Sequence, residues 1–100
     1  MTYRVLYAEQ FHEKLNDQLT YFADQGVPES RVSNWLRGLL FQMDSFERNP
    51  ERYAVAEVES DIEGIELRRL VYGDYLILYH VEENLREVQI YGFRHAARLP

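Results

Sequence analysis

The sequence predicts an α+β fold of two layers with the element order β-α-α-β-β-β, in which a helical hairpin packs on one face of a small, largely antiparallel sheet. Two observations predict this fold. Apolar residues recur every three or four positions through residues 8–48, as in amphipathic helices, and form short alternating or continuous runs after residue 64, as in strands. One hundred residues suffice for one core, so residues 1–100 are expected to form a single domain.

The chain is expected to open with a strand followed by a helix. Residues 3–7 alternate and contain β-branched and aromatic side chains, which favours a strand. Residues 8–25 are expected to be helical because large apolar side chains fall on one stripe, at spacings of four, four and three: Phe11, Leu15, Leu19 and Phe22. Gly26 is a typical residue just after the end of a helix.

A second helix is predicted from about residue 28 to residue 48. Pro28 suits a first helical turn, and the pair Asn49-Pro50 ends the helix. The apolar stripe of this helix comprises Val32, Trp35, Leu36, Leu39, Leu40, Met43 and Phe46. The short link around Gly26 makes the two helices antiparallel neighbours.

Three further strands are predicted over residues 65–72, 75–82 and 87–93. The pair Gly73-Asp74 fits a two-residue hairpin turn, and residues 83–85 form a longer turn. Residues 51–64 have the weakest pattern; we interpret 53–56 as a short edge strand and the acid-rich 57–64 as a loop.

Both faces of the predicted central strand are largely apolar. Tyr75, Ile77 and Tyr79 point to one side of the sheet, whereas Leu76, Leu78 and His80 point to the other. Two helices can cover only one of these faces. The other face is therefore expected to be partly exposed, or covered by something else, and an exposed apolar face indicates a partner.

The composition excludes several classes of protein. Hydrophobic residues make up 46% of the chain and aromatic residues 14%, which indicates a folded domain. There is no Cys and the three His lack a metal-ligand spacing, so neither a metal nor a cofactor is expected. No apolar run approaches the roughly 20 residues that span a bilayer, and no signal-peptide pattern is present, so we expect a cytoplasmic location.

The charge is unevenly distributed. The net charge of −6 argues against a general nucleic-acid binder, because phosphate contacts need a basic surface. Residues 8–60 contain ten acids and five Lys or Arg, whereas residues 88–100 contain no acid but include Arg94, His95 and Arg98. An acidic helical half thus stands beside a cationic C-terminal edge.

Three short sequence motifs are the most distinctive part of the chain: LRRL at 67–70, GDYLILY at 73–79 and FRHAAR at 93–98. They follow an initial Tyr-Arg-Val strand and two amphipathic helices, the second closed by Asn49-Pro50. In this order and spacing, over nearly the whole chain, they resemble the RelE/ParE superfamily of bacterial toxin–antitoxin toxins, most closely its ParE, or plasmid-stabilisation, branch.

The resemblance implies a compact toxin held inactive by a cognate antitoxin, whose C-terminal segment wraps the helices and the sheet in a hetero-oligomer. ParE-like members inhibit DNA gyrase without a recognised hydrolytic site. RelE-like members cleave mRNA on the ribosome with basic residues and a Tyr or His, and they usually carry several Lys near the sheet. This chain has one Lys, Lys14, on its first helix.

The low Lys count favours a ParE-like toxin that acts on a protein target, DNA gyrase, rather than by its own catalysis. Two alternatives stay open: a metal-independent mRNA endonuclease, and a non-toxic family member that binds only an antitoxin-like partner. The partner-binding candidates are Arg68, Arg69, Tyr75, Arg94, His95 and Arg98.

The candidates differ in what their chemistry allows. Arg68 and Arg69 are adjacent on a strand, so one should lie over the helices and the other should face a partner, unless both form ordinary surface salt bridges. A nuclease would use His95 as an acid or base near neutral pH. Positive charge around the phosphate would come from Arg94, Arg98 and Arg69. Tyr72, Tyr75, Tyr79 and Tyr91 are interpreted as core or interface residues.

Overall fold

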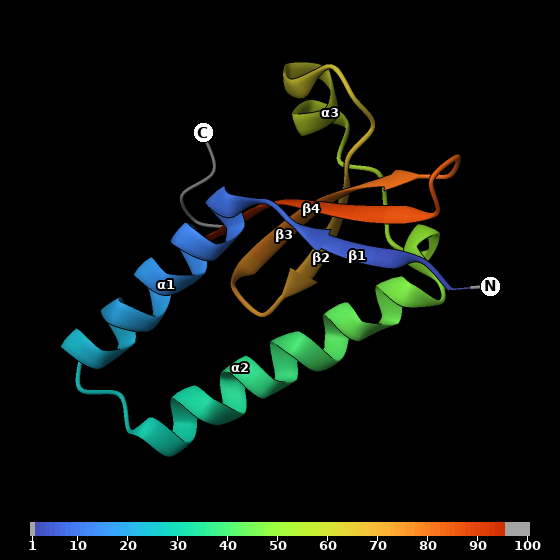
Figure 1. The fold of residues 1–100 in the computed structure, drawn as a ribbon. Coiled ribbons are helices and arrows are strands. Elements are labelled where there is room, and N and C mark those ends of the chain that lie inside the picture. The colour runs from blue at the N-terminus through green and yellow to red at the C-terminus, as the bar shows by residue number, and fades with distance from the viewer. Residues whose placement is uncertain (1, 96–100) are drawn as a thin grey trace.

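The computed structural model describes residues 2–95 (Figure 1). The four strands are β1 (Arg4–Tyr7), β2 (Arg68–Tyr72), β3 (Tyr75–Glu82) and β4 (Glu87–His95). The three α-helices are α1 (Glu9–Asp24), α2 (Glu29–Asp44) and α3 (Glu57–Glu63), and two single 3₁₀ turns are η1 (Ser45–Glu47) and η2 (Pro50–Arg52).

The strands form one mixed sheet in the order β1-β4-β3-β2. The pairs β2–β3 and β3–β4 are antiparallel, and β1 runs parallel to β4. A parallel pair needs a long crossover, which α1, α2 and the segment after them provide. The predicted two-layer α+β architecture is therefore confirmed, with one parallel pair at the edge of the sheet.

The main core lies between the sheet and the helical hairpin. Its residues come from α1, α2, η1 and one face of all three long strands: Phe11, Leu39, Met43, Phe46, Leu70, Ile77, Tyr79, Val88, Ile90 and Phe93. The rings of Phe46 and Tyr79 lie 4.2 Å apart between centroids. Burial of this apolar area is the dominant favourable term in folding and fixes which face of each strand points inward.

The two long helices run in opposite directions but splay apart from the link that joins them (Figure 1). The Tyr72 hydroxyl of β2 donates to the Trp35 carbonyl of α2 at 2.7 Å. A Cβ atom at Gly38 would lie only 2.2 Å from that hydroxyl oxygen. Gly38 therefore allows α2 to approach the sheet closely at this point.

The opposite face of the sheet, which we call the outer face, is only partly covered. Figure 1 shows α3 on the side of the sheet away from α1 and α2. The chain leading into α3 pairs with β2 and the residue before it: Val55 bridges Arg68, and the Ala56 N–H donates to the Leu67 carbonyl. A second, small apolar cluster results, made of Ala56, Leu76 and Leu78.

The structure corrects five predictions about element bounds. Residues 57–64 are not a loop, because 57–63 form α3, which ends at Gly64 in the left-handed conformation (φ 75°). The edge strand over 53–56 is reduced to a single bridge at Val55. The second helix ends at Asp44, and its expected last turn is the 3₁₀ turn η1.

The fourth and fifth corrections concern two of the predicted strands. The strand predicted from residue 65 begins only at Arg68, whereas the last strand continues beyond residue 93. Arg94 and His95 pair with Leu76 and Tyr75. These two candidate residues therefore belong to β4 and do not follow it.

Candidate partner-binding site

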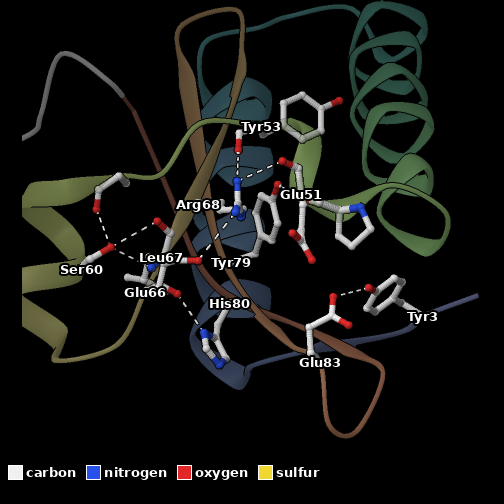
Figure 2. Close-up of polar contacts among 12 residues, drawn as sticks. Tyr3, Glu51, Tyr53, Ser60, Glu66, Leu67, Arg68, Tyr79, His80 and Glu83 are labelled. Atoms are coloured by element: carbon white, nitrogen blue, oxygen red, sulfur yellow. Dashed lines mark hydrogen bonds and ion pairs between the residues drawn. The ribbon is translucent and has the colours of Figure 1, made fainter.

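Arg68 points to the helix side of the sheet. It pairs with Tyr79 across β2 and β3, and its side chain is only 17% exposed. Its guanidinium donates from Nη1 to the carbonyl oxygens of Glu51 at 3.0 Å and Tyr53 at 2.7 Å (Figure 2). Nη2 lies 3.7 Å from the Glu66 carboxylate. Arg68 therefore ties the η2 segment to the sheet, and little of its charge is available to a partner.

The tyrosine beside Arg68 is also occupied within the fold. Tyr79 is fully buried, and its hydroxyl donates to the Pro50 carbonyl. Burial raises the pKa of Tyr79 above its ordinary value, which keeps the phenol neutral. Tyr79 is thus a structural hydrogen-bond donor, in agreement with its interpretation as a core residue.

Near Arg68, the surface carries paired acids. The Tyr3 hydroxyl donates to Glu83, and this hydrogen bond lowers the pKa of the Glu83 carboxyl (Figure 2). A contact with Glu83 in turn raises the pKa of Glu51. Glu83 also forms an ion pair with Arg86, whose Nη1 lies 3.3 Å from the carboxylate, so these acids belong to a cluster of mixed charge.

Arg69 points the opposite way, to the outer face. It pairs with Leu78, and its backbone N–H donates to the Ala54 carbonyl at 3.0 Å. Its side chain is exposed. The pairing of β2 with β3 therefore confirms that the two arginines lie on opposite faces of the sheet, with Arg68 on the helix side.

Tyr75 and His95 contact each other on the helix side of the sheet. The Tyr75 ring stacks on Phe93, with centroids 5.3 Å apart and planes inclined by 10°. His95 meets Tyr75 edge-on at 5.1 Å, and Trp35 meets Tyr75 edge-on at 5.3 Å. Both candidates are half-buried in an aromatic cluster and expose only part of their surface.

Arg94 points to the outer face, because it pairs with Leu76. It lines a hollow of about 270 Å³ between α1 and α3. The floor of this hollow is apolar and comes from Leu67, Leu78 and Gly92. The remaining lining residues are Gln10, Lys14, Glu63, Tyr91 and Phe93.

A second hollow, of about 500 Å³, lies between α1 and the end of β4. Beyond Ile90, β4 no longer pairs with β1, and α1 takes the place of a strand beside it. Arg94 and His95 both reach this hollow, together with Lys14, Asp17, Gln18, Tyr21 and Phe93.

The candidate residues come together only in part. Arg94 and His95 line the same hollow, whereas Arg68 and Arg69 do not line it, and Arg98 lies outside the described residues. The α1 residues that line the hollows, Lys14 above all, were not among the predicted site residues. The signal in the sequence was a second helical stripe beside the apolar one, formed by Gln10, Lys14, Asp17, Gln18 and Tyr21.

Two further kinds of site are absent from residues 2–95. No group of three or more His, Asp or Glu side chains there could hold a metal ion. None of the helices in that range has both the length and the apolar content needed to cross a bilayer.

The family of the chain follows from a comparison with known protein families. The family described as the ParE toxin of the type II toxin–antitoxin system parDE matches residues 5–100. This chain belongs to the ParE toxin family. The match covers every strand and helix described above except the first residue of β1. It confirms the resemblance that the three sequence motifs indicated.

A solved structure is similar in fold. The archaeal RelE–RelB complex from Pyrococcus horikoshii OT3 contains a chain with 24% sequence identity and a TM-score of 0.61, and the alignment covers 99% of this chain and 100% of that one. The ParE-family chain therefore has a RelE-like fold. No curated protein matches it.

Proposed function

We propose that this ParE-family chain is the toxin of a type II toxin–antitoxin module, that it acts by binding a protein target, DNA gyrase, and that a cognate antitoxin neutralises it. The family match supports the toxin role. The complex of RelE with RelB in the structural neighbour supports a bound antitoxin partner. The uncovered part of the outer face and the helical hairpin are the surfaces that this antitoxin would cover.

The observation that carries the choice of a binding mechanism is the separation of Arg68 and Arg69 from His95. Catalysis of phosphodiester cleavage needs an acid or base and positive charge within hydrogen-bond reach of one phosphate. Here Arg68 is engaged by backbone carbonyls, and Arg69 lies on the opposite face from His95. A protein target tolerates such a dispersed set, because its contacts are spread over a surface.

The test is induced expression without the antitoxin, in a bacterial host that carries a DNA-damage reporter, followed by assay of the purified chain on gyrase supercoiling. We expect growth arrest, reporter induction, intact transcripts and loss of supercoiling. Arrest without inhibition of supercoiling or reporter induction would contradict the gyrase target. Expression without arrest would indicate a family member that binds an antitoxin but is not toxic.

A metal-independent mRNA endonuclease is the second candidate, and the hollow beside α1 favours it. Arg94, His95 and Lys14 all line that hollow, so a phosphate there would meet three groups able to carry positive charge. This function predicts that His95→Ala abolishes transcript cleavage while the fold persists. Cleavage is to be followed on ribosome-bound mRNA, with His12→Ala as the control, because His12 is exposed on α1.

A further inference from the structure

The solvent side of α2 carries two adjacent apolar side chains. Phe41 is 76% exposed and Leu40 is 48% exposed, whereas Leu39 is buried in the main core. Phe41 follows Leu39 by two residues, which places it about 200° around the helix and therefore away from the sheet. Exposed apolar residues are common on protein surfaces, so this pair alone assigns no partner. The charges beside it do.

Two opposite charges flank the apolar pair, one helical turn away on either side. Arg37 precedes Phe41 by four residues, and Asp44 follows Leu40 by four residues, so all four side chains are neighbours on one face. Arg37 and Asp44 are both exposed, and within residues 2–95 neither forms an ion pair with another side chain. Along α2 the order is thus a cation, the apolar pair and an anion.

A second copy of α2, laid antiparallel across the first, is complementary to this face. A two-fold axis between Leu40 and Phe41 places Arg37 of each copy against Asp44 of the other, because an isologous interface repeats each contact twice. The apolar pairs of the two copies meet at the axis and leave water. A parallel copy would instead place each charge against its own kind, which is unfavourable.

The positions further out fit the same antiparallel arrangement. One turn outward, the neutral Ser33 and Asn34 of one copy lie opposite the stretch at 47–48 of the other, where α2 has continued into η1 and the chain carries Glu47 and then Arg48. Neutral polar side chains therefore meet charged ones there, and like charges are not opposed. The whole face is thus complementary to itself in one orientation.

We infer that the free chain forms an antiparallel homodimer through the solvent side of α2, with Leu40 and Phe41 of both copies at its centre and two reciprocal ion pairs between Arg37 and Asp44. This inference does not rest on the proposed function, because the dimer needs neither gyrase nor an antitoxin. An antitoxin that covers the helical hairpin would compete with the second copy for α2.

The test measures dimerisation of the full chain at pH 7 by sedimentation equilibrium. We expect the wild-type chain to dimerise with a dissociation constant below about 100 μM. Arg37→Glu and Asp44→Arg should each weaken the dimer by at least about tenfold, because each opposes like charges at two places. Asp44→Arg is the sharper of the two. It lowers the net negative charge of the chain, so general repulsion alone would make it associate more tightly than the wild type.

Charge exchange then distinguishes a reciprocal interface from any other. The double variant Arg37→Glu with Asp44→Arg should regain the wild-type dimer, since the two charges have changed places. An equimolar mixture of the two single variants should form a heterodimer in native mass spectrometry, because every pair across that interface joins opposite charges. Neither single variant should form its own homodimer at the same concentration.

Matched controls carry the same charge changes away from this face. Arg31→Glu lies beside the hollow at the link between α1 and α2, and Asp24→Arg lies at the end of α1; both positions are exposed. Each should change the dissociation constant by less than about twofold. In the unmodified chain, the amide resonances of residues 37–44 should shift as the concentration rises, which tests the same surface without any substitution.

Several results would overturn the inference. A wild-type chain that stays monomeric at about 100 μM would do so and leave the face to a different protein. Tighter association of Asp44→Arg, a mixture of the single variants without a heterodimer, or concentration-dependent shifts confined to residues outside α2 and η1 would each overturn it as well. None of these results bears on gyrase inhibition, so the proposed function stands or falls separately.

Discussion

At the scale of the residue, two adjacent arginines have opposite roles because a strand alternates. Arg68 donates to two backbone carbonyls from a side chain that is mostly buried, whereas Arg69 is exposed on the outer face. Hydrogen bonds from a charged donor contribute more to stability than neutral ones. The first arginine therefore supports the fold, and the second is available for binding.

This difference predicts unequal effects of the same substitution. Arg68→Met keeps the length of the stem but removes the donors to Glu51 and Tyr53, and it should lower the free energy of unfolding by about 1–3 kcal/mol. Arg69→Met, the matched control, should change that free energy by less than about 0.5 kcal/mol. Urea denaturation of both variants measures the two values. Equal effects would contradict the structural role of Arg68.

The sequence alone predicts that the two arginines face opposite ways, but not which one faces the helices. That choice depends on the pairing of Arg68 with Tyr79, and a shift of one residue would exchange the two faces. Lys14 escaped prediction for a similar reason. Its stripe on α1 lies beside β4 only because β1 stops pairing at Ile90 and α1 takes its place.

At the scale of the element, α3 is the part of the fold with the least apolar support. None of its seven residues is buried, and Val58 and Ile62 are 68% and 70% exposed. Ser60 holds the helix to the chain after it: its hydroxyl accepts from the Leu67 N–H at 2.7 Å and lies 2.7 Å from the Ala56 carbonyl (Figure 2). Polar contacts thus position α3, which contributes Glu63 to the lining of the first hollow.

Removal of this hydroxyl should loosen α3 selectively. Ser60→Ala leaves the N–H of the buried Leu67 without its acceptor, which costs about 1–3 kcal/mol. We expect faster amide hydrogen exchange in residues 59–67 and unchanged exchange in α1. Ser33→Ala on α2 is the control, because it is exposed and gains the same helix propensity. Unchanged exchange in α3 of the Ser60→Ala variant would show that other contacts hold the helix.

Sequence reasoning missed α3 because helices are recognised by the stripe they bury, and α3 buries none. Its remaining signals were local: Glu57 and Glu59 in the first turn and Gly64 just after the end. Apart from the end of α2, the long elements were predicted correctly, since α1, α2 and β3 each place large apolar side chains in the main core. The extension of β4 to His95 depends on the length of its partner β3, which only the folded pairing defines.

At the scale of the whole molecule, net charge and exposed apolar surface have opposite effects on self-association. Phe41 on α2 is 76% exposed and Leu40 beside it 48% exposed, in addition to the apolar side chains of α3. Exposed apolar patches promote association, and a net charge of −6 at pH 7 opposes it by repulsion. Such a balance between repulsion and apolar attraction suits a chain whose exposed apolar surface is covered when a partner binds.

The chain should associate more strongly when its net negative charge is removed. The isoelectric point is about 5.0, so lowering the pH from 7 to 5 cancels the repulsion and leaves the apolar surface unchanged. We expect dynamic light scattering at constant ionic strength to show a larger mean particle size at pH 5 than at pH 7. Phe41→Ser should reduce this growth at pH 5, because it removes the large apolar side chain that is most exposed within residues 2–95 without disturbing the core. If the particle size were the same at both pH values, or if Phe41→Ser left the growth unchanged, charge repulsion between exposed apolar surfaces would not control the association of this chain.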